Sequence, residues 1–368
     1  MPKANETILE IDLTALKHNY EHLRSKLQPN TKFLAVVKAF SYGNDSVPIA
    51  QHLEKCGTDY FAVAYTSEGE ELRNAGIKKP ILVLHPQKIN LETIINRCLE
   101  PSIYSQKTLL EFIETAKRKN QTNYPIHLKF NTGLNRLGFD KQDLPFITET
   151  LSGTTAVKVV SCFSHLAASE DLTEDAFTKS QIALFKDITS NLIPKLGYTP
   201  ILHQCNTSGI LNYPQAHFDM VRSGIGIYGF ANDPKYQPDL IPIASLKTVI
   251  SQIHELQPGD SLGYNRGLIT NKVMRTATLP IGHADGLTRI YGKGKGFVFI
   301  NNQKAYIVGN VCMDMVMVDV THIDCEEGDE VIVFDKIHTA EALAEAAETI
   351  SYELITDLSK RIKRVFLI

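Results

Sequence analysis

The sequence predicts an α/β protein, with an N-terminal (β/α)8 TIM-type barrel over residues 1–232 and a mainly β C-terminal domain over residues 233–368. In the first part, eight short apolar runs each lead into a polar turn and then an amphipathic stretch of helical spacing. Strands that alternate with helices pair in parallel, and eight repeats within about 200 residues favour a closed barrel over an open sheet. After residue 232 the helical spacing stops, and short β-rich runs separated by glycine and Asn-Asn turns predict a second domain.

The elements follow from this pattern in order. The alternating stretch ILEID, residues 8–12, predicts a strand, and Asp12 can cap the helix that follows it. Residues 1–11 could pack with the β domain. The barrel strands are predicted at 33–39, 60–64, 81–85, 102–104, 126–130, 157–165, 200–206 and 219–223, with helices between them, for example at 47–55, 67–74, 91–98, 107–118 and 174–192.

Fewer elements of the second domain can be predicted from the sequence. GFVFINNQKAYIVG, residues 296–309, predicts a hairpin with Asn301 and Asn302 in its turn. Residues 340–350 predict a helix, which precedes the last segment, RVFLI.

The composition excludes several function classes. With 43% hydrophobic and 21% charged residues and a net charge of −3, the chain has no bias toward nucleic acid or membrane surfaces. The N-terminus lacks an apolar core of signal-peptide length and no run approaches a membrane span, so we expect a cytoplasmic protein. The six cysteines form no C-x-x-C pair and have no histidine at metal-ligand spacing, so we expect reduced thiols and no metal.

Polar residues follow several of the predicted barrel strands. Chemistry in such barrels sits where the strands end. The residues at those points are Lys38, Arg136, His165, Asn206, Thr207, Arg222 and Gly224. They are therefore the candidate functional residues.

Lys38 is the most informative of them. It ends an apolar run, FLAVVKA, although lysine is normally excluded from cores because its ammonium is costly to desolvate. Desolvation lowers the pKa of a lysine and favours the neutral amine that attacks carbonyls. The alternative is a side chain that has left the strand for solvent, and this stretch alone does not separate the two.

The loops after the last two barrel strands indicate which kind of ligand the site could bind. HQCNTSG and MVRSGIGIYG offer small hydroxyls and glycine amides that could surround a phosphate. A lysine, a phosphate site and Arg222 are the parts that a pyridoxal phosphate site requires. Arginine stays charged and can only donate, so facing the pyridine nitrogen it would leave that nitrogen unprotonated and favour limited Cα proton abstraction over transamination.

Motifs along nearly the whole chain now resemble those of the alanine racemase family. They occur in the family's order and spacing, as AVVKAFSYG, LKFNTGLNRLG, FSHLA, HQCNTSG, VRSGIGIYG, SLGYNR, IGHADG, GNVCMDM and SYEL. The resemblance implies a homodimeric pyridoxal 5'-phosphate enzyme that interconverts L- and D-alanine for peptidoglycan synthesis. Lys38 matches the lysine that binds the cofactor and acts as the base on one face of the substrate. Tyr264 matches the base on the other face, contributed by the second subunit.

The resemblance also assigns supporting residues. His165 would lie between Tyr264 and Arg222, and Arg136 would contact the cofactor and orient the substrate carboxylate. Met313 of the partner subunit would contact that carboxylate through its backbone amide. Phosphate ligands are matched by Tyr42, Thr207, Gly224, Ile225 and Tyr352, and Asn206 stands beside them as a further cofactor-binding residue.

Lys129 has a separate role in many relatives, where it is carbamylated and holds the arginine. Strand alternation puts it on one face with His127 and Asn131, leading toward Arg136. The modification is a hypothesis for this chain.

Some residues depart from the family pattern. Phe40, Ser41 and Asn44 replace the more common asparagine, alanine and histidine near the lysine. His283 stands where most relatives have tyrosine in the substrate access passage, and Asn310 stands where arginine is common; Asp171 and Arg289 match there. These changes leave substrate selectivity open. The alternatives are a serine or broad-spectrum racemase, a non-catalytic barrel protein that binds the cofactor, and a decarboxylase on the related fold, which would favour a glutamate at the ring nitrogen.

Overall fold

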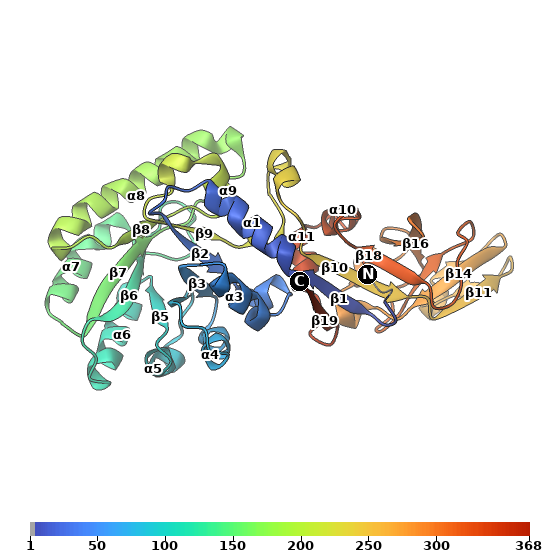
Figure 1. The fold of residues 1–368 in the computed structure, drawn as a ribbon, viewed down its shortest axis with the longest axis horizontal. Helices are drawn as coiled ribbons and strands as arrows, with labels where there is room; N and C mark the ends of the chain where they lie inside the picture. Colours follow the sequence, from blue (N-terminus) through green and yellow to red (C-terminus); the bar gives the residue numbers. More distant parts are fainter. Residues whose placement is uncertain (1–3) are drawn as a thin grey trace. The chain divides into compact units, whose positions relative to one another are not determined.

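A computed structural model describes residues 4–368 of the chain. These residues form two compact units (Figure 1). The barrel unit comprises Lys17–Ser41 and Ser46–Leu240, and the β unit comprises the residues up to Leu16, Tyr42–Asp45 and Ile241–Ile368.

The barrel unit contains the predicted closed barrel of eight parallel strands. They follow one another around the ring, and the first pairs with the last to close it. The strands are β2 (Lys32–Val36), β3 (Tyr60–Val63), β4 (Ile81–Val83), β5 (Glu100–Ile103), β6 (Tyr124–Lys129), β7 (Val157–Phe163), β8 (Ile201–His203) and β9 (Met220–Ser223). Each lies within or close to a predicted run, which confirms the fold class.

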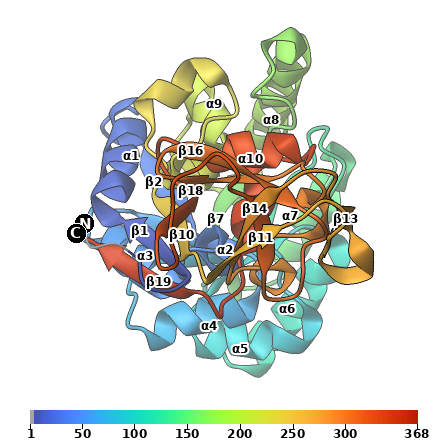
Figure 2. The same cartoon turned by 90° about the vertical axis from the view of Figure 1, so that its right-hand side faces the viewer.

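Helices connect the strands and cover the outside of the barrel (Figure 2). They are α1 (Leu13–Ser25), α3 (Ser46–Lys55), α4 (Thr66–Asn74), α5 (Leu91–Asn96), α6 (Gln106–Arg118), α7 (Leu144–Ser152), α8 (Asp175–Leu196) and α9 (Thr207–Asn212). The short segment α2 (Lys38–Tyr42), which follows β2, is not one of these outer helices. Asp12 accepts a hydrogen bond from the Ala15 amide at 2.9 Å, so it caps α1 as predicted. Burial of their apolar stripes, including the fully buried Phe112 and Phe185, attaches these helices to the strands.

The β unit is built on one nine-stranded sheet, in the order β11-β14-β17-β16-β15-β18-β10-β1-β19. Its strands are β1 (Ile8–Asp12), β10 (Ala244–Val249), β11 (Gln252–Leu256), β14 (Met274–Leu279), β15 (Phe297–Ile300), β16 (Gln303–Val308), β17 (Val316–Asp319), β18 (Glu330–Phe334) and β19 (Lys363–Leu367). A separate pair consists of β12 (Ser261–Leu262) and β13 (Leu268–Ile269). The first strand lies between β10 and β19, so the first and the last strand of the described residues are neighbours in this sheet (Figure 1).

Local details of the β unit partly follow the predictions. β15 and β16 form the predicted hairpin, with Asn301 and Asn302 at positive φ in its turn. The helix predicted over 340–350 is present as α10 (Ala340–Ala346) but ends four residues earlier than predicted, and a second helix, α11 (Ser351–Thr356), follows it. Glu348 adopts a φ of 60°, and the amides of Glu348 and Thr349 bond back to Glu345 and Ala344, a closed helix end that stops α10.

Tyr42–Asp45 groups with the β unit, a difference from the predicted boundaries. Gly43 has a φ of 85°, and a Cβ there would lie 2.0 Å from the Ile355 carbonyl oxygen, so only glycine lets this backbone lie against α11. Among residues 4–368, no helix combines the length and apolar character that crossing a bilayer requires.

Candidate active site

Lys38 lies just beyond β2, at the carboxyl end of the barrel strands. The strand ends at Val36, earlier than predicted, and the lysine is half-buried. Burial lowers the pKa of its ammonium, the positive charge of Arg136 lowers it further, and Glu68 opposes both. Lys38 is therefore not a freely solvated lysine. At a given pH, a larger fraction of its amine is neutral than in an ordinary surface lysine.

The strand ends early because the next residues form a left-handed turn. Ala39, Phe40, Ser41 and Tyr42 have φ values of 51°, 55°, 51° and 53°, although none is glycine. Such a conformation costs about 1–2 kcal/mol for each ordinary residue, so the surrounding structure must hold the turn in place. The sequence pattern contains no glycine that could have revealed it.

Glu68 is one group that holds this turn. Its Oε1 accepts a hydrogen bond from the Ala39 amide at 2.7 Å, and its Oε2 accepts bonds from the Ala64 and Tyr65 amides at 2.7 and 3.1 Å. The carboxylate thus ties the residue after Lys38 to the end of β3. Sequence reasoning missed Glu68; its position in the first turn of a helix that follows a barrel strand is the signal that could have indicated it.

Four cationic side chains act on one another at this end of the barrel. Lys129 is 7% exposed, and burial together with Arg136, Arg222 and Lys38 lowers the pKa of its amine to about 8. Burial and the positive charges of these four side chains hold the pKa of His165 well below its ordinary value, so this imidazole is neutral at pH 7. The structure thus brings Lys38, Lys129, Arg136 and Arg222 together around His165. A concentration of positive charge of this kind fits an anionic ligand.

Arg222, at the end of β9, bonds only to neutral acceptors. Its Nη1 donates to His203 Nδ1 at 2.7 Å, and its Nη2 donates to the Ser164 and Gln204 carbonyls at 2.7 and 3.0 Å and to His165 Nδ1 at 3.1 Å. Nε and the second Nη1 hydrogen make no hydrogen bond to residues 4–368. Burial lowers the pKa of the guanidinium to about 10, so it remains charged at pH 7. Arg222 therefore keeps donors for a further acceptor.

The loops after β8 and β9 contact each other, as the predicted phosphate site requires. Thr207 Oγ1 lies 3.0 Å from Ser223 Oγ and accepts a hydrogen bond from the Gly226 amide at 3.3 Å. A Cβ on Gly226 would lie 2.5 Å from the Thr207 methyl, so glycine permits this approach. Asn206 caps α9 by accepting from the Gly209 amide at 2.9 Å, and Gly224 precedes the 3-10 turn Ile225–Tyr228.

Asp171 is exposed at the surface of the barrel unit. It caps a surface turn, Leu172–Glu174, where its Oδ1 accepts from the Thr173 amide at 2.8 Å and from the Thr173 hydroxyl at 2.7 Å. These hydrogen bonds lower the pKa of its carboxyl, so the residue is an anion at pH 7.

The remaining candidates belong to the β unit. The rings of Tyr42 and Tyr352 lie 6.2 Å apart, and burial raises the pKa of the Tyr42 phenol, which therefore stays protonated. Tyr264 lies in the turn between β12 and β13 and is 74% exposed. Asn310 Nδ2 donates to the Tyr264 carbonyl at 3.0 Å, so the residue that departs from the family pattern supports the backbone of the candidate base.

Met313 lies in a loop that other segments hold firmly. The His283 and Ala284 amides donate to the Cys312 and Met313 carbonyls, both at 3.0 Å. A Cβ on Gly282 would lie 2.4 Å from the Met313 oxygen, so the two loops touch through their backbones. The Met313 side chain is 58% exposed, while His283 and Arg289 are also exposed on the same unit.

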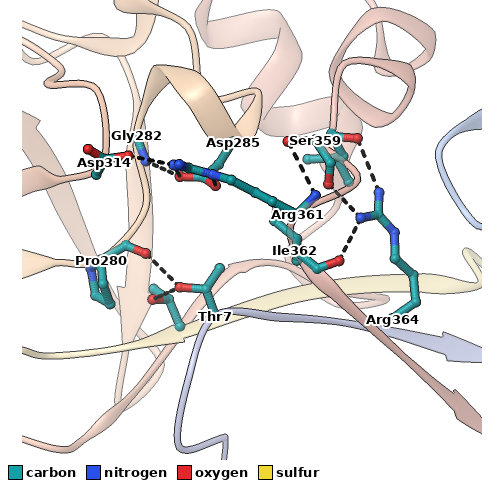
Figure 3. A network of polar contacts seen from close by, with 11 residues as sticks. Thr7, Pro280, Gly282, Asp285, Asp314, Ser359, Arg361, Ile362 and Arg364 are labelled. Carbon is teal, nitrogen blue, oxygen red and sulfur yellow. Dashed lines mark hydrogen bonds and ion pairs between the residues drawn. The ribbon is translucent and has the colours of Figure 1, made fainter.

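Arg361 joins these two loops (Figure 3). Its Nε and Nη2 donate to the two oxygens of the buried Asp285 at 2.6 and 2.9 Å, and Nη2 also donates to Asp314 at 2.8 Å. Hydrogen bonds to the two carboxylates raise the pKa of the guanidinium, so the charge on Arg361 is permanent. Sequence reasoning missed this arginine, since nothing in the pattern connects residue 361 with residues 285 and 314.

A closed eight-stranded barrel with a desolvated lysine at the carboxyl ends of its strands is the architecture of a barrel enzyme, whose chemistry takes place at this end. Comparison with known proteins specifies the family. Residues 11–232 match the family described as alanine racemase, N-terminal domain, and residues 243–366 match its C-terminal domain. The chain therefore belongs to the alanine racemase family.

Individual relatives agree over the full length. The chain is 34% identical to an alanine racemase of Halothermothrix orenii, with 98% of this chain and 96% of the relative covered. Its structure is similar to that of an alanine racemase from Clostridium difficile 630, with a TM-score of 0.92, 33% identity and coverage of 100% and 97%. It is also similar to an alanine racemase from Bartonella henselae described with covalently bound pyridoxal phosphate, with a TM-score of 0.90, 30% identity and coverage of 99% and 100%.

Proposed function

We propose that this protein interconverts L- and D-alanine, with pyridoxal 5'-phosphate bound through Lys38. The observation that carries the proposal is the group of four cations around His165, which includes Lys38 and in which Arg222 bonds only to neutral acceptors. The serine or broad-spectrum alternative is not favoured by the family comparisons.

The residues of the barrel mouth fit the cofactor. The unused Nε–H and Nη1–H of Arg222 suit the lone pair of a pyridine nitrogen, since arginine donates without giving up its proton. The hydroxyl of Thr207 and the glycine backbone after β9 suit a phosphate. The family resemblance assigns the hydroxyls of Tyr42 and Tyr352 to the same phosphate. When bound, pyridoxal phosphate supplies an electron sink that makes the Cα proton of an amino acid acidic.

Racemisation then needs a proton to leave one face of Cα and arrive on the other. We assign Lys38 Nζ to one face and Tyr264 Oη of the partner subunit to the other. One base alone would return the proton to the same face and regenerate the starting enantiomer. His165 accepts from Arg222 through Nδ1, so its proton is on Nε2, where it can donate to the Tyr264 oxygen and stabilise a phenolate.

Arg136 and the amide of Met313 are assigned to the substrate carboxylate. Lys129 is assigned to a carbamate, which its lowered pKa supports: near pH 8 about half of the amine is neutral and can attack carbon dioxide. Its nitrogen forms a bond to the carbon and releases one proton, and the resulting anion would lie among the cations and hold Arg136. The passage residues Asp171, His283, Arg289 and Asn310 are assigned to substrate access.

The assignment of Tyr264 and Met313 to a partner's site requires a homodimer. Their exposure in the single chain, 74% and 58%, supports this role. We place the enzyme in the cytoplasm, where D-alanine is needed for peptidoglycan synthesis.

The direct test is to incubate the cofactor-loaded protein separately with L-alanine and L-serine and to follow both enantiomers by chiral chromatography. We expect L-alanine to approach an equal mixture of enantiomers, with serine turning over far more slowly. Equal rates would indicate a broad-spectrum racemase, and no D-product from either substrate would refute the proposal.

A further inference from the structure

A buried chain of polar side chains crosses five consecutive barrel strands and ends on Arg222. Glu100 of β5, His127 of β6, Ser161 of β7, His203 of β8 and Arg222 of β9 contribute one residue each. The links are Glu100 Oε2 to His127 Nε2 at 2.7 Å, His127 Nδ1 to Ser161 Oγ at 2.5 Å, Ser161 Oγ to His203 Nε2 at 3.0 Å, and His203 Nδ1 to Arg222 Nη1 at 2.7 Å.

The surroundings exclude water from most of this chain. His127, Ser161 and His203 are completely buried, and the Glu100 side chain is 14% exposed. The Phe163 ring stacks on His203 with 4.9 Å between centroids and lies 5.4 Å from the Arg222 guanidinium carbon. These side chains therefore have few alternative partners.

The arginine fixes the direction of the chain. A guanidinium only donates, so His203 Nδ1 must accept and its proton must be on Nε2, which donates to Ser161. Burial and Arg222 hold the pKa of His203 well below its ordinary value, which agrees with a neutral ring. Because the serine oxygen accepts from His203, its own hydrogen is left to donate to His127 Nδ1, and His127 Nε2–H then donates to the Glu100 carboxylate. Every link then runs from the cation to the anion.

We propose that Glu100, His127, Ser161 and His203 are positioning residues that orient Arg222 and balance its charge from a distance. A carboxylate bonded directly to Arg222 would occupy its donors and cancel its field on His165 and Lys129. A hydrogen bond to the neutral His203 imidazole leaves free donors on Arg222 and leaves its positive charge uncancelled at His165 and Lys129. The negative charge that compensates this buried cation lies four hydrogen bonds away, on Glu100 at the start of β5. The role of Arg222 toward the cofactor rests on the proposed function; the direction of the chain does not.

The first test uses the cofactor-free protein with ¹⁵N-labelled histidine. Nitrogen chemical shifts distinguish protonated from unprotonated ring nitrogens, and we expect His127 and His203 both to carry their proton on Nε2. His203 as the Nδ1–H form, or as an imidazolium, would overturn the proposal. Because no cofactor is present, this result is independent of racemase activity.

The second test breaks the chain in its middle. Ser161→Ala removes the hydroxyl that joins the two imidazoles, while Ser161→Thr retains it. Ser102→Ala is the matched control, because Ser102 is a fully buried serine of β5 whose hydroxyl has no partner among residues 4–368. We expect Ser161→Ala to shift the His203 nitrogen signals and to lower kcat roughly tenfold with little change in KM, and Ser161→Thr to restore both.

If Ser161→Ala does not fold, Glu100→Gln serves instead, since its amide oxygen can still accept from His127 while the charge is lost. It should lower kcat without disturbing the His203 tautomer. If the nitrogen shifts and kinetics of every folded variant are unchanged and equal those of Ser102→Ala, the proposal is refuted. The chain of hydrogen bonds would then be only a structural feature. A wild type with the expected tautomers but no racemase activity would refute the proposed function alone.

Discussion

At the scale of single residues, the candidate site depends on what burial does to positive charge. Lys38 and Lys129 both have lowered pKa values because each is desolvated and faces other cations. Strand alternation could predict that Lys129 leads toward Arg136, since the period of a strand is two residues. It could not predict the convergence of Arg222 and Lys38 on the same point, which depends on closure of the barrel.

The lowered pKa of Lys129 predicts the pH dependence of its modification. Only the neutral amine attacks carbon dioxide, so carbamylation should fall as the pH drops below about 8, where the amine becomes protonated. With ¹³C-labelled bicarbonate, a carbamate carbon signal should be present in wild type and in Lys158→Gln, an exposed lysine of β7, and absent in Lys129→Gln. A signal that persists in Lys129→Gln, or a structure with a free amine at Lys129, would contradict this.

At the scale of elements, repetition made most of the barrel predictable. Each strand is a short apolar run between polar turns, so its place could be predicted from the sequence to within a few residues. The left-handed turn after Lys38 could not, because its four residues contain no glycine and their conformation is imposed by contacts such as the one to Glu68. The chain from Glu100 to His203 and Arg361 were missed because their partners are distant in sequence, and so was the bond from Ala39 to Glu68.

The strain of the turn after Lys38 can be measured at Ala39. Its side chain is exposed, so Ala39→Gly removes little packing while relieving a φ of 51°. We expect the free energy of unfolding to rise by about 1 kcal/mol, and Ala39→Val to lower it by more than that, because a β-branched residue tolerates this region poorly. Urea denaturation of the three proteins measures the effect. Destabilisation by glycine would show that the turn is not strained.

Arg361 should affect substrate binding more than turnover. Arg361→Ala leaves the buried Asp285 without its ion pair and releases the loop of Asp314, next to Met313. We expect a lower free energy of unfolding and a raised KM for alanine with a smaller change in kcat. Lys363→Ala, which removes only an exposed ion pair to Glu6, is the control. An unchanged KM in folded Arg361→Ala would exclude this role.

At the scale of the whole molecule, sequence patterns predicted the class of the fold and the change from alternating strands and helices to mainly β structure. They did not predict that Tyr42–Asp45 groups with the β unit, because that depends on the close approach of Gly43 to Ile355. The proposed site takes Lys38 from one subunit and Tyr264 from the other. Shared sites therefore need a test with mixed subunits.

Mixed dimers of two inactive variants supply that test. If one subunit contributes Lys38 and the other Tyr264, a dimer of one Lys38→Ala and one Tyr264→Phe subunit contains one intact site. After unfolding and refolding an equal mixture, activity should recover to about a quarter of wild type, since half of the dimers are mixed and each has one of two sites. Activity no higher than that of the separate variants would mean that each chain builds its own site.

In the proposed mechanism, Lys38 and Tyr264 act as bases on opposite faces of the substrate. Incorporation of deuterium at Cα of L- and D-alanine in heavy water, followed by NMR for wild type, Lys38→Ala and Tyr264→Phe, tests it most directly. We predict exchange of both enantiomers in wild type, of only one in Tyr264→Phe and of neither in Lys38→Ala. Equal exchange of both enantiomers in all three proteins would contradict the account.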